Sequence, residues 1–253
     1  MKTINLFGLS LDIKWHEPTF NFKKIESLTE DVDADLIVLP EMFPTGFSMT
    51  PEQIADKDAS SLEWMKAYAQ RKNAAICGSV AIQEGGSYLN RMYFVTPEGD
   101  FSYYDKRHLF SFSGEDKVYT AGTDRIVVVY KGIRFLLQVC YDLRFPVFSR
   151  YKEDYDAILY VANWPDKRVE HWQSLLKARA IENQCYVLGV NRIGVDGNDL
   201  NYIPSSYLYF ADGKSVAEET SNGITGTIDL KRLDEYRNHY KFLLDRDPFF
   251  LED

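Results

Sequence analysis

Short apolar runs bounded by Gly, Pro, Asp or Asn recur along the chain and predict buried β-strands, because most of them are rich in Val, Ile, Leu, Phe and Tyr. The predicted strands are Ile4–Ile13, Leu36–Leu39, Ala74–Val80, Arg91–Val95, Ile126–Tyr130, Ile133–Val139, Ala157–Val161, Tyr186–Val190 and Gly226–Ile228. Between some of them, apolar residues recur at helical spacing. The predicted helices are Phe20–Leu28, Ser60–Lys72 and Lys167–Asn183.

The order of these elements predicts an α/β layered protein with a mixed sheet. Strands alternate with helices, but the runs Ile126–Tyr130 and Ile133–Val139 are separated only by Lys131-Gly132, which is typical of a tight hairpin turn. No linker rich in Pro, Gly or Ser divides the chain, so we expect a single domain over residues 1–253. The tail after Asp229 is rich in Tyr and Phe, and we expect it to pack against the body or a partner subunit.

Composition narrows the class of function. Lys and Arg number 29 against 38 Asp and Glu, which gives a formal net charge of −9 and argues against a general nucleic-acid binder. The three cysteines, Cys77, Cys140 and Cys185, are an odd number without a C-x-x-C pair, so we expect free thiols and a cytoplasmic setting. The start of the chain predicts neither a signal peptide nor a membrane span.

Several sites of well-known pattern are not supported by the sequence. A phosphate loop, a dinucleotide fingerprint and a G-x-S-x-G nucleophile turn are all missing. The histidines are scattered without the spacing of metal ligands, so we interpret them as surface or structural residues and expect no metal site. The histidines are His16, His108, His171 and His239.

Three ionisable or nucleophilic residues lie where strand-like runs stop. Glu41 follows Leu36-Ile37-Val38-Leu39-Pro40, Lys106 follows Phe101-Ser102-Tyr103-Tyr104-Asp105, and Cys140 follows the run that ends at Val139. Ligand sites of open α/β sheets gather at the carboxyl ends of strands, so these side chains suggest one crevice. Each residue alone is more often structural: a packed thiol, an acid at a helix start, a solvated lysine. Their combination is what indicates a site.

Three ordered motifs resemble the nitrilase (carbon–nitrogen hydrolase) superfamily. They are Leu39-Pro40-Glu41-Met42-Phe43, Asp105-Lys106-Arg107-His108-Leu109-Phe110 and Cys140-Tyr141-Asp142-Leu143-Arg144-Phe145-Pro146. Further stretches resemble the omega-amidase branch of that superfamily. They are Ala162-Asn163-Trp164-Pro165, His171-Trp172 and Ala178-Arg179-Ala180-Ile181-Glu182-Asn183-Gln184.

The resemblance implies an α-β-β-α sandwich fold and a homodimer. It further implies that the reaction needs no cofactor. It also implies that Glu41 is the general base, Lys106 the catalytic lysine and Cys140 the nucleophile. The second glutamate of the family is best matched by Glu115, although Asp116 in the same loop is an alternative. One stretch departs from the family pattern: Pro204 lies where relatives often have a glycine, and because Pro lacks a backbone N–H we expect a different loop shape there.

The implied activity is hydrolysis of the terminal amide of a small dicarboxylate monoamide such as 2-oxoglutaramate. We expect Phe43, Tyr141 and Trp164 to wall the pocket, since small-molecule sites are mostly apolar. Arg144 is a candidate anchor for the anionic end of such a substrate, or a structural ion-pair partner. Alternatives are a carbamoylase, a nitrilase, a deaminated-glutathione amidase, or a non-catalytic α/β protein that binds a small molecule. We expect no nucleic-acid or membrane partner.

Overall fold

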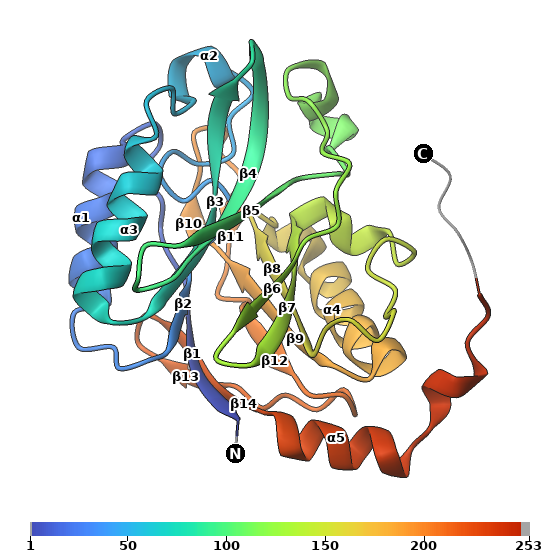
Figure 1. The fold of residues 1–253 in the computed structure, drawn as a ribbon. Helices are drawn as coiled ribbons and strands as arrows, with labels where there is room; N and C mark the ends of the chain where they lie inside the picture. The colour runs from blue at the N-terminus through green and yellow to red at the C-terminus, as the bar shows by residue number, and fades with distance from the viewer. Residues whose placement is uncertain (1, 249–253) are drawn as a thin grey trace.

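Two β-sheets that face each other form the centre of the protein in the computed structural model, which describes residues 2–248 (Figure 1). The first sheet has the order β13 (Glu218–Thr220), β14 (Gly223–Asp229), β1 (Thr3–Leu9), β2 (Leu36–Val38), β3 (Ala75–Glu84), β4 (Ser87–Val95) and β5 (Phe101–Asp105). The second has the order β12 (Tyr207–Tyr209), β9 (Tyr186–Asn191), β8 (Ala157–Ala162), β7 (Ile133–Val139) and β6 (Val127–Tyr130). A separate small ribbon pairs β10 (Gly194–Val195) with β11 (Asn201–Tyr202).

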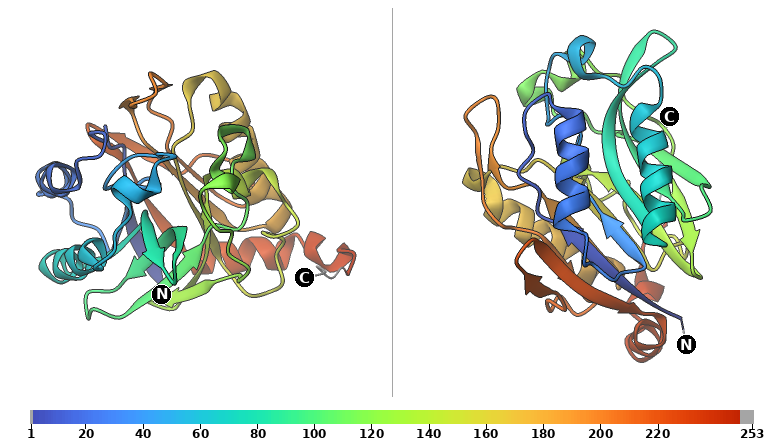
Figure 2. Two further views of the ribbon diagram at one scale, coloured as in Figure 1. Left: turned by 90° about the horizontal axis from the view of Figure 1, so that it is seen from above. Right: turned by 90° about the vertical axis from the view of Figure 1, so that its left-hand side faces the viewer.

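Helices cover the outer faces of both sheets. The helices α1 (Pro18–Leu28) and α3 (Ser60–Lys72) lie on the first sheet, and α4 (Val169–Asn183) lies on the second (Figure 2). The short α2 (Pro51–Ile54) lies in the connection that follows β2. This is the α-β-β-α sandwich that the resemblance implied. The mixed sheet expected from the strand pattern is in fact two sheets, because periodicity along the chain does not tell which strands pair.

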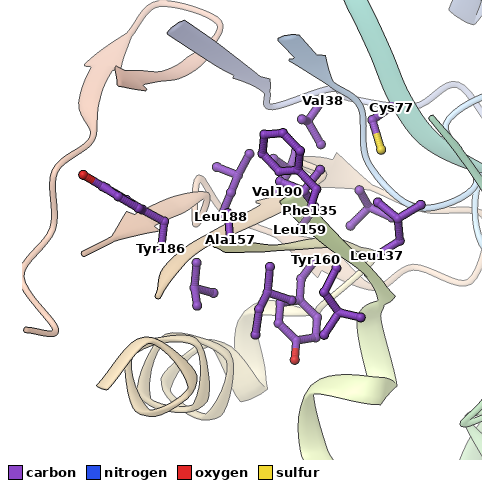
Figure 3. Packing of buried hydrophobic residues seen from close by; sticks show 14 of the residues in the cluster. Val38, Cys77, Phe135, Leu137, Ala157, Leu159, Tyr160, Tyr186, Leu188 and Val190 are labelled. Carbon is purple, nitrogen blue, oxygen red and sulfur yellow. The ribbon is translucent and has the colours of Figure 1, made fainter. Parts of the chain in front are cut away.

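The main core fills the space between the sheets. Val38 and Cys77 of the first sheet face Phe135 and Leu137 of the second (Figure 3). The Phe135 ring lies 5.9 Å from that of Phe94 in β4, so aromatic side chains join the two layers. A second cluster lies under α1 and α3 and includes the predicted helix residues Leu62, Met65 and Ala69. This second cluster joins the two outer helices to the first sheet.

The predicted hairpin is confirmed. Strands β6 and β7 pair antiparallel with Tyr130 opposite Ile133. Lys131 and Gly132 between them have φ angles of 48° and 78°, the left-handed pair that a two-residue turn needs to match the twist of its strands. The predicted helices also form, although α4 begins at Val169, after a 3-10 helix over Asp166–Arg168.

The aromatic tail is partly packed. Helix α5 (Leu230–His239) follows β14, and its Tyr236 ring lies 5.3 Å from that of Phe210 in the body. Phe242 and Leu244 beyond it are exposed. The tail residues Phe249 and Phe250 lie outside the described residues, and the homodimer stays a prediction. Within residues 2–248, the helices are too short or too polar to cross a membrane.

Close packing between α4 and β9 gives a stability prediction at Gly189. A Cβ atom there would lie 2.3 Å from Cδ1 of Leu176 and 2.8 Å from the Trp172 ring. We expect Gly189→Ala to lower the free energy of unfolding by about 1–3 kcal/mol, the usual cost of overpacking a core. Urea unfolding measures this change.

The matched test is the double variant Gly189→Ala/Leu176→Val, which removes the clashing methyl group. Its loss of unfolding free energy should be smaller than the sum of the two single losses, because the closest contact of the new Cβ is then relieved. Strictly additive losses would contradict overpacking as the cause.

Candidate active site

Four strand ends bring the candidate residues to one edge of the sandwich. Glu41 follows β2, Lys106 follows β5, Cys140 follows β7, and Asn163 follows β8. The first two strands run in the same direction within the first sheet, and β7 and β8 run parallel within the second. Because the sheets pack face to face, the carboxyl ends of all four strands meet, and the side chains expected in one crevice do lie together.

A buried lysine between two carboxylates is the centre of the site. Lys106 Nζ lies 2.9 Å from Glu41 Oε1 and 2.8 Å from Glu115 Oε2, and all three side chains have an exposed fraction of 0%. Asp116, the alternative to Glu115, is exposed. The structure therefore brings Glu115, not Asp116, into contact with the lysine.

The opposite charges of Lys106 and the two glutamates shift the pKa values within this cluster. Burial opposes the positive charge of Lys106, but the nearby Glu115 and Glu41 carboxylates outweigh it and raise the pKa of the lysine. Burial raises the pKa of Glu115, and the charge of Glu41 adds to this, although Lys106 partly offsets both. The lysine is therefore held as an ammonium ion, and one of the two carboxyl groups is a weaker acid than a free glutamate.

Two asparagines fix the carboxylates in place. Asn90 Nδ2 donates to Glu41 Oε1 at 2.9 Å and to Glu115 Oε1 at 3.3 Å, so it bridges the two groups. The backbone N–H of Asn163 donates to Glu41 Oε2 at 2.9 Å, and its side-chain Nδ2 donates to the backbone oxygen of Glu41 at 2.6 Å. Glu41 is thus anchored through both carboxylate oxygens and its main chain.

Cys140 occupies a sharp turn between β7 and a 3-10 helix over Cys140–Arg144. Its φ of 45° lies in the left-handed region, which is costly for a residue with a side chain and is often found at functional sites. Asp142 holds the turn, because it accepts from the backbone N–H of Val139 and from the Tyr104 hydroxyl, both within 2.9 Å. Asp142 also accepts from the backbone N–H of His108 at 3.0 Å, which joins the turn to the loop after Lys106.

The Cys140 thiol is neutral in this environment. Burial raises its pKa well above the usual range, the negative charge of Glu41 adds to the increase, and Lys106 only partly opposes them. A neutral thiol is a poor nucleophile, so its chemistry requires a base in contact with it. Cys77 and Cys185 are also buried, but each lies in the hydrophobic core and neither lines the pocket.

A pocket of about 260 Å³ opens over Cys140. Of the residues predicted to surround the substrate, Tyr141, Trp164 and Arg144 do line this pocket. The prediction for Phe43 is wrong. Its ring is fully buried and packs beside Phe22 and Trp64 under the outer helices, because the chain turns at Met42 and directs the next side chain into the core.

Residues missed by the sequence reasoning complete the site. Asn90 and Asp142 hold the reactive side chains, and Phe47 and Arg168 line the pocket. Asp142 and Arg168 lie in or near recognised motifs, whereas Asn90 lies inside a strand with no sequence signal. Within residues 2–248, His, Cys, Asp and Glu form no group that could hold a metal ion.

Known proteins resemble this chain over most of its length. The family model described as "Carbon-nitrogen hydrolase" matches residues 8–238. The chain is 42% identical to a protein named omega-amidase YafV from Yersinia enterocolitica, over 99% of this chain and 100% of that protein. It is 34% identical to a 2-oxoglutaramate amidase from Bacillus subtilis, over 90% of this chain and 92% of that protein.

The fold of a solved relative is also very similar. A CN-hydrolase superfamily protein from Xanthomonas campestris, described with an arsenic adduct in its active site, superposes with a TM-score of 0.95 at 40% identity, covering 100% of both chains. The family match, these relatives and the two-sheet fold with its reactive cluster lead to one conclusion. The chain belongs to the carbon–nitrogen hydrolase (nitrilase) superfamily, in its omega-amidase branch, and is a hydrolase that acts on carbon–nitrogen bonds other than peptide bonds.

Proposed function

We propose that the protein hydrolyses the terminal amide of a short dicarboxylate monoamide, such as 2-oxoglutaramate, through a thioester on Cys140. The observation that carries the proposal is the buried group of Glu41, Lys106 and Glu115 beside Cys140, at the base of a small pocket. The similarity to proteins named omega-amidase and 2-oxoglutaramate amidase supports the substrate class. A pocket of about 260 Å³ also suits a substrate of this size.

The first half of the reaction forms the thioester. Glu41 takes the thiol proton, and Cys140 Sγ attacks the amide carbonyl carbon. The negative charge then develops on the carbonyl oxygen, where the Lys106 ammonium and the backbone N–H of Tyr141 stabilise it. Glu41 returns the proton to the amide nitrogen, the carbon–nitrogen bond breaks, and ammonia leaves.

The second half releases the acid. Glu41 removes a proton from a water molecule, the water oxygen attacks the thioester carbonyl, and Lys106 again stabilises the oxyanion. When the carbon–sulfur bond breaks, Glu41 returns this proton to Cys140 Sγ, and the dicarboxylic acid product leaves. Glu115 contributes by holding Lys106 in position at 2.8 Å. The raised pKa of the thiol explains why thioester formation needs Glu41 as a base.

Ammonia release by the purified protein tests the proposed activity. The panel contains 2-oxoglutaramate, glutamine, a nitrile and an N-carbamoyl amino acid. We expect 2-oxoglutaramate to have the highest kcat/KM. Preferred turnover of the nitrile or of the carbamoyl compound would assign a different branch activity, and no turnover of any compound would favour the non-catalytic alternative.

Replacement of the nucleophile should abolish the activity. We expect Cys140→Ala to leave less than roughly a tenth of the wild-type rate, a generous limit for loss of a nucleophile. Cys77→Ala and Cys185→Ala are the matched controls, because each removes a buried thiol that lies away from the carboxylates. Substantial turnover by Cys140→Ala would rule out the thioester route.

Lys106 should act by its charge and position. Lys106→Met keeps the length of the side chain and should slow acylation at least ~10²-fold, the usual loss for an oxyanion donor. Lys106→Arg should fail as well, because a planar guanidinium does not replace a compact ammonium between two carboxylates.

Intact-protein mass spectrometry after rapid quenching identifies the covalent intermediate. In the wild-type protein we expect the acyl group on Cys140. Substrate trapped on Lys106 by borohydride would instead indicate a Schiff base and exclude the proposed mechanism.

A further inference from the structure

Two arginines line the pocket without a carboxylate partner. Arg144 and Arg168 are both partly exposed to the pocket, and neither forms an ion pair with a described residue. Lys106 differs, because it forms ion pairs with both Glu41 and Glu115. The pocket is therefore lined by two arginines whose charges are not used by a described acidic side chain.

The guanidinium group of Arg144 is positioned by aromatic side chains. It lies 5.1 Å from the centre of the Trp164 ring, and its Nη2 lies 3.0 Å from Nδ1 of His171. Among the described residues, no acidic side chain forms an ion pair with it. Arg144 is therefore positioned, but its charge is not compensated. This excludes the reading of Arg144 as a partner in a structural ion pair among the described residues.

Arg168 is positioned in a similar way. It ends the 3-10 helix before α4, and its guanidinium lies 5.5 Å from the centre of the Phe110 ring. Its backbone oxygen accepts from Trp164 Nε1 at 2.7 Å, so Trp164 contacts both arginines. The Phe110 ring also lies 4.9 Å from that of Tyr141, next to Cys140.

The remaining acid of the pocket wall does not neutralise the arginines. Asp196 Oδ1 accepts from the backbone N–H groups of Asn198 and Leu200, at 2.8 Å and 3.0 Å. Its Oδ2 accepts from the Tyr202 hydroxyl at 2.8 Å. Asp196 therefore organises its own loop and leaves both guanidinium groups available.

We propose that Arg144 and Arg168 together form a subsite for the distal carboxylate of the amide substrate, and that Arg168 is a specificity-determining residue. The proposal rests on the proposed amidase function. Guanidinium groups bind carboxylates through paired, charge-assisted hydrogen bonds, and the apolar ring faces around them strengthen the attraction by excluding water. Binding of the distal carboxylate at this subsite directs the amide end of the substrate toward Cys140.

The kinetic test compares two substrates that differ at the far end. Succinamate carries a carboxylate where butyramide carries a methyl group. We expect Arg168→Met to lower kcat/KM for succinamate by about 10- to 100-fold, the value of a hydrogen bond between charged groups. Butyramide turnover should fall much less, because its methyl end forms no charge-assisted hydrogen bond with a guanidinium group. Arg144→Met should behave in the same way.

Lys167→Met is the matched control. It removes one positive charge from the same 3-10 helix, but Lys167 is exposed and does not line the pocket. It should leave both substrates unaffected. An equal loss for both substrates in Arg168→Met, or an equal effect of Lys167→Met on succinamate, would overturn the subsite.

A binding measurement separates this proposal from the proposed activity. In the Cys140→Ala background, which cannot form the thioester, calorimetry gives the Kd of succinamate with and without Arg168→Met. We expect the Kd to rise about 10- to 100-fold with Arg168→Met and not with Lys167→Met. Unchanged or absent succinamate binding would overturn the subsite, whatever the ammonia assay shows. Intact binding together with no turnover by the wild-type protein would refute the activity alone.

Discussion

The arrangement of the site depends on the ion pairs that Lys106 makes with Glu41 and Glu115. All three side chains are shielded from water, and removal of one member of such a buried group leaves an uncompensated charge at a cost of about 3–5 kcal/mol. The three residues come from separate segments of the chain, so the ion pairs form only when β2, β5 and the loop after β5 have their native positions. The reactive centre therefore forms only when the first sheet is correctly packed.

The second sheet supplies the nucleophile to this centre. Asp142 joins the Cys140 turn to the loop that carries His108, and Asn163 joins the end of β8 to Glu41. These hydrogen bonds cross from one sheet to the other, so they set the distance between the thiol and its base. The pocket that results opens over Cys140 and is lined by Arg144 and Arg168.

The limits of sequence reasoning are clear at particular residues. Glu41, Lys106 and Cys140 could be found because each directly follows a strong strand pattern and lies in a recognisable motif. Phe43 lies in such a motif too, but its side chain points into the core after the turn at Met42, and a motif does not encode that direction. Asn90 has the sequence context of an ordinary polar residue in a β-strand. Its role becomes visible only in the structure, where its side chain donates to both Glu41 and Glu115.

The sequence by itself determined the helices, most strands, the β6–β7 hairpin and the family motifs, because periodicity and turn chemistry act between neighbours in the chain. Only the tertiary structure decided that the strands form two sheets, that Glu115 rather than Asp116 contacts Lys106, and that Arg168 joins Arg144 at the pocket. Burial, ion pairing and the shape of a pocket depend on residues far apart in sequence. The packing of the layers therefore determines which side chains are buried, paired or exposed in the pocket, and no local pattern in the sequence does so.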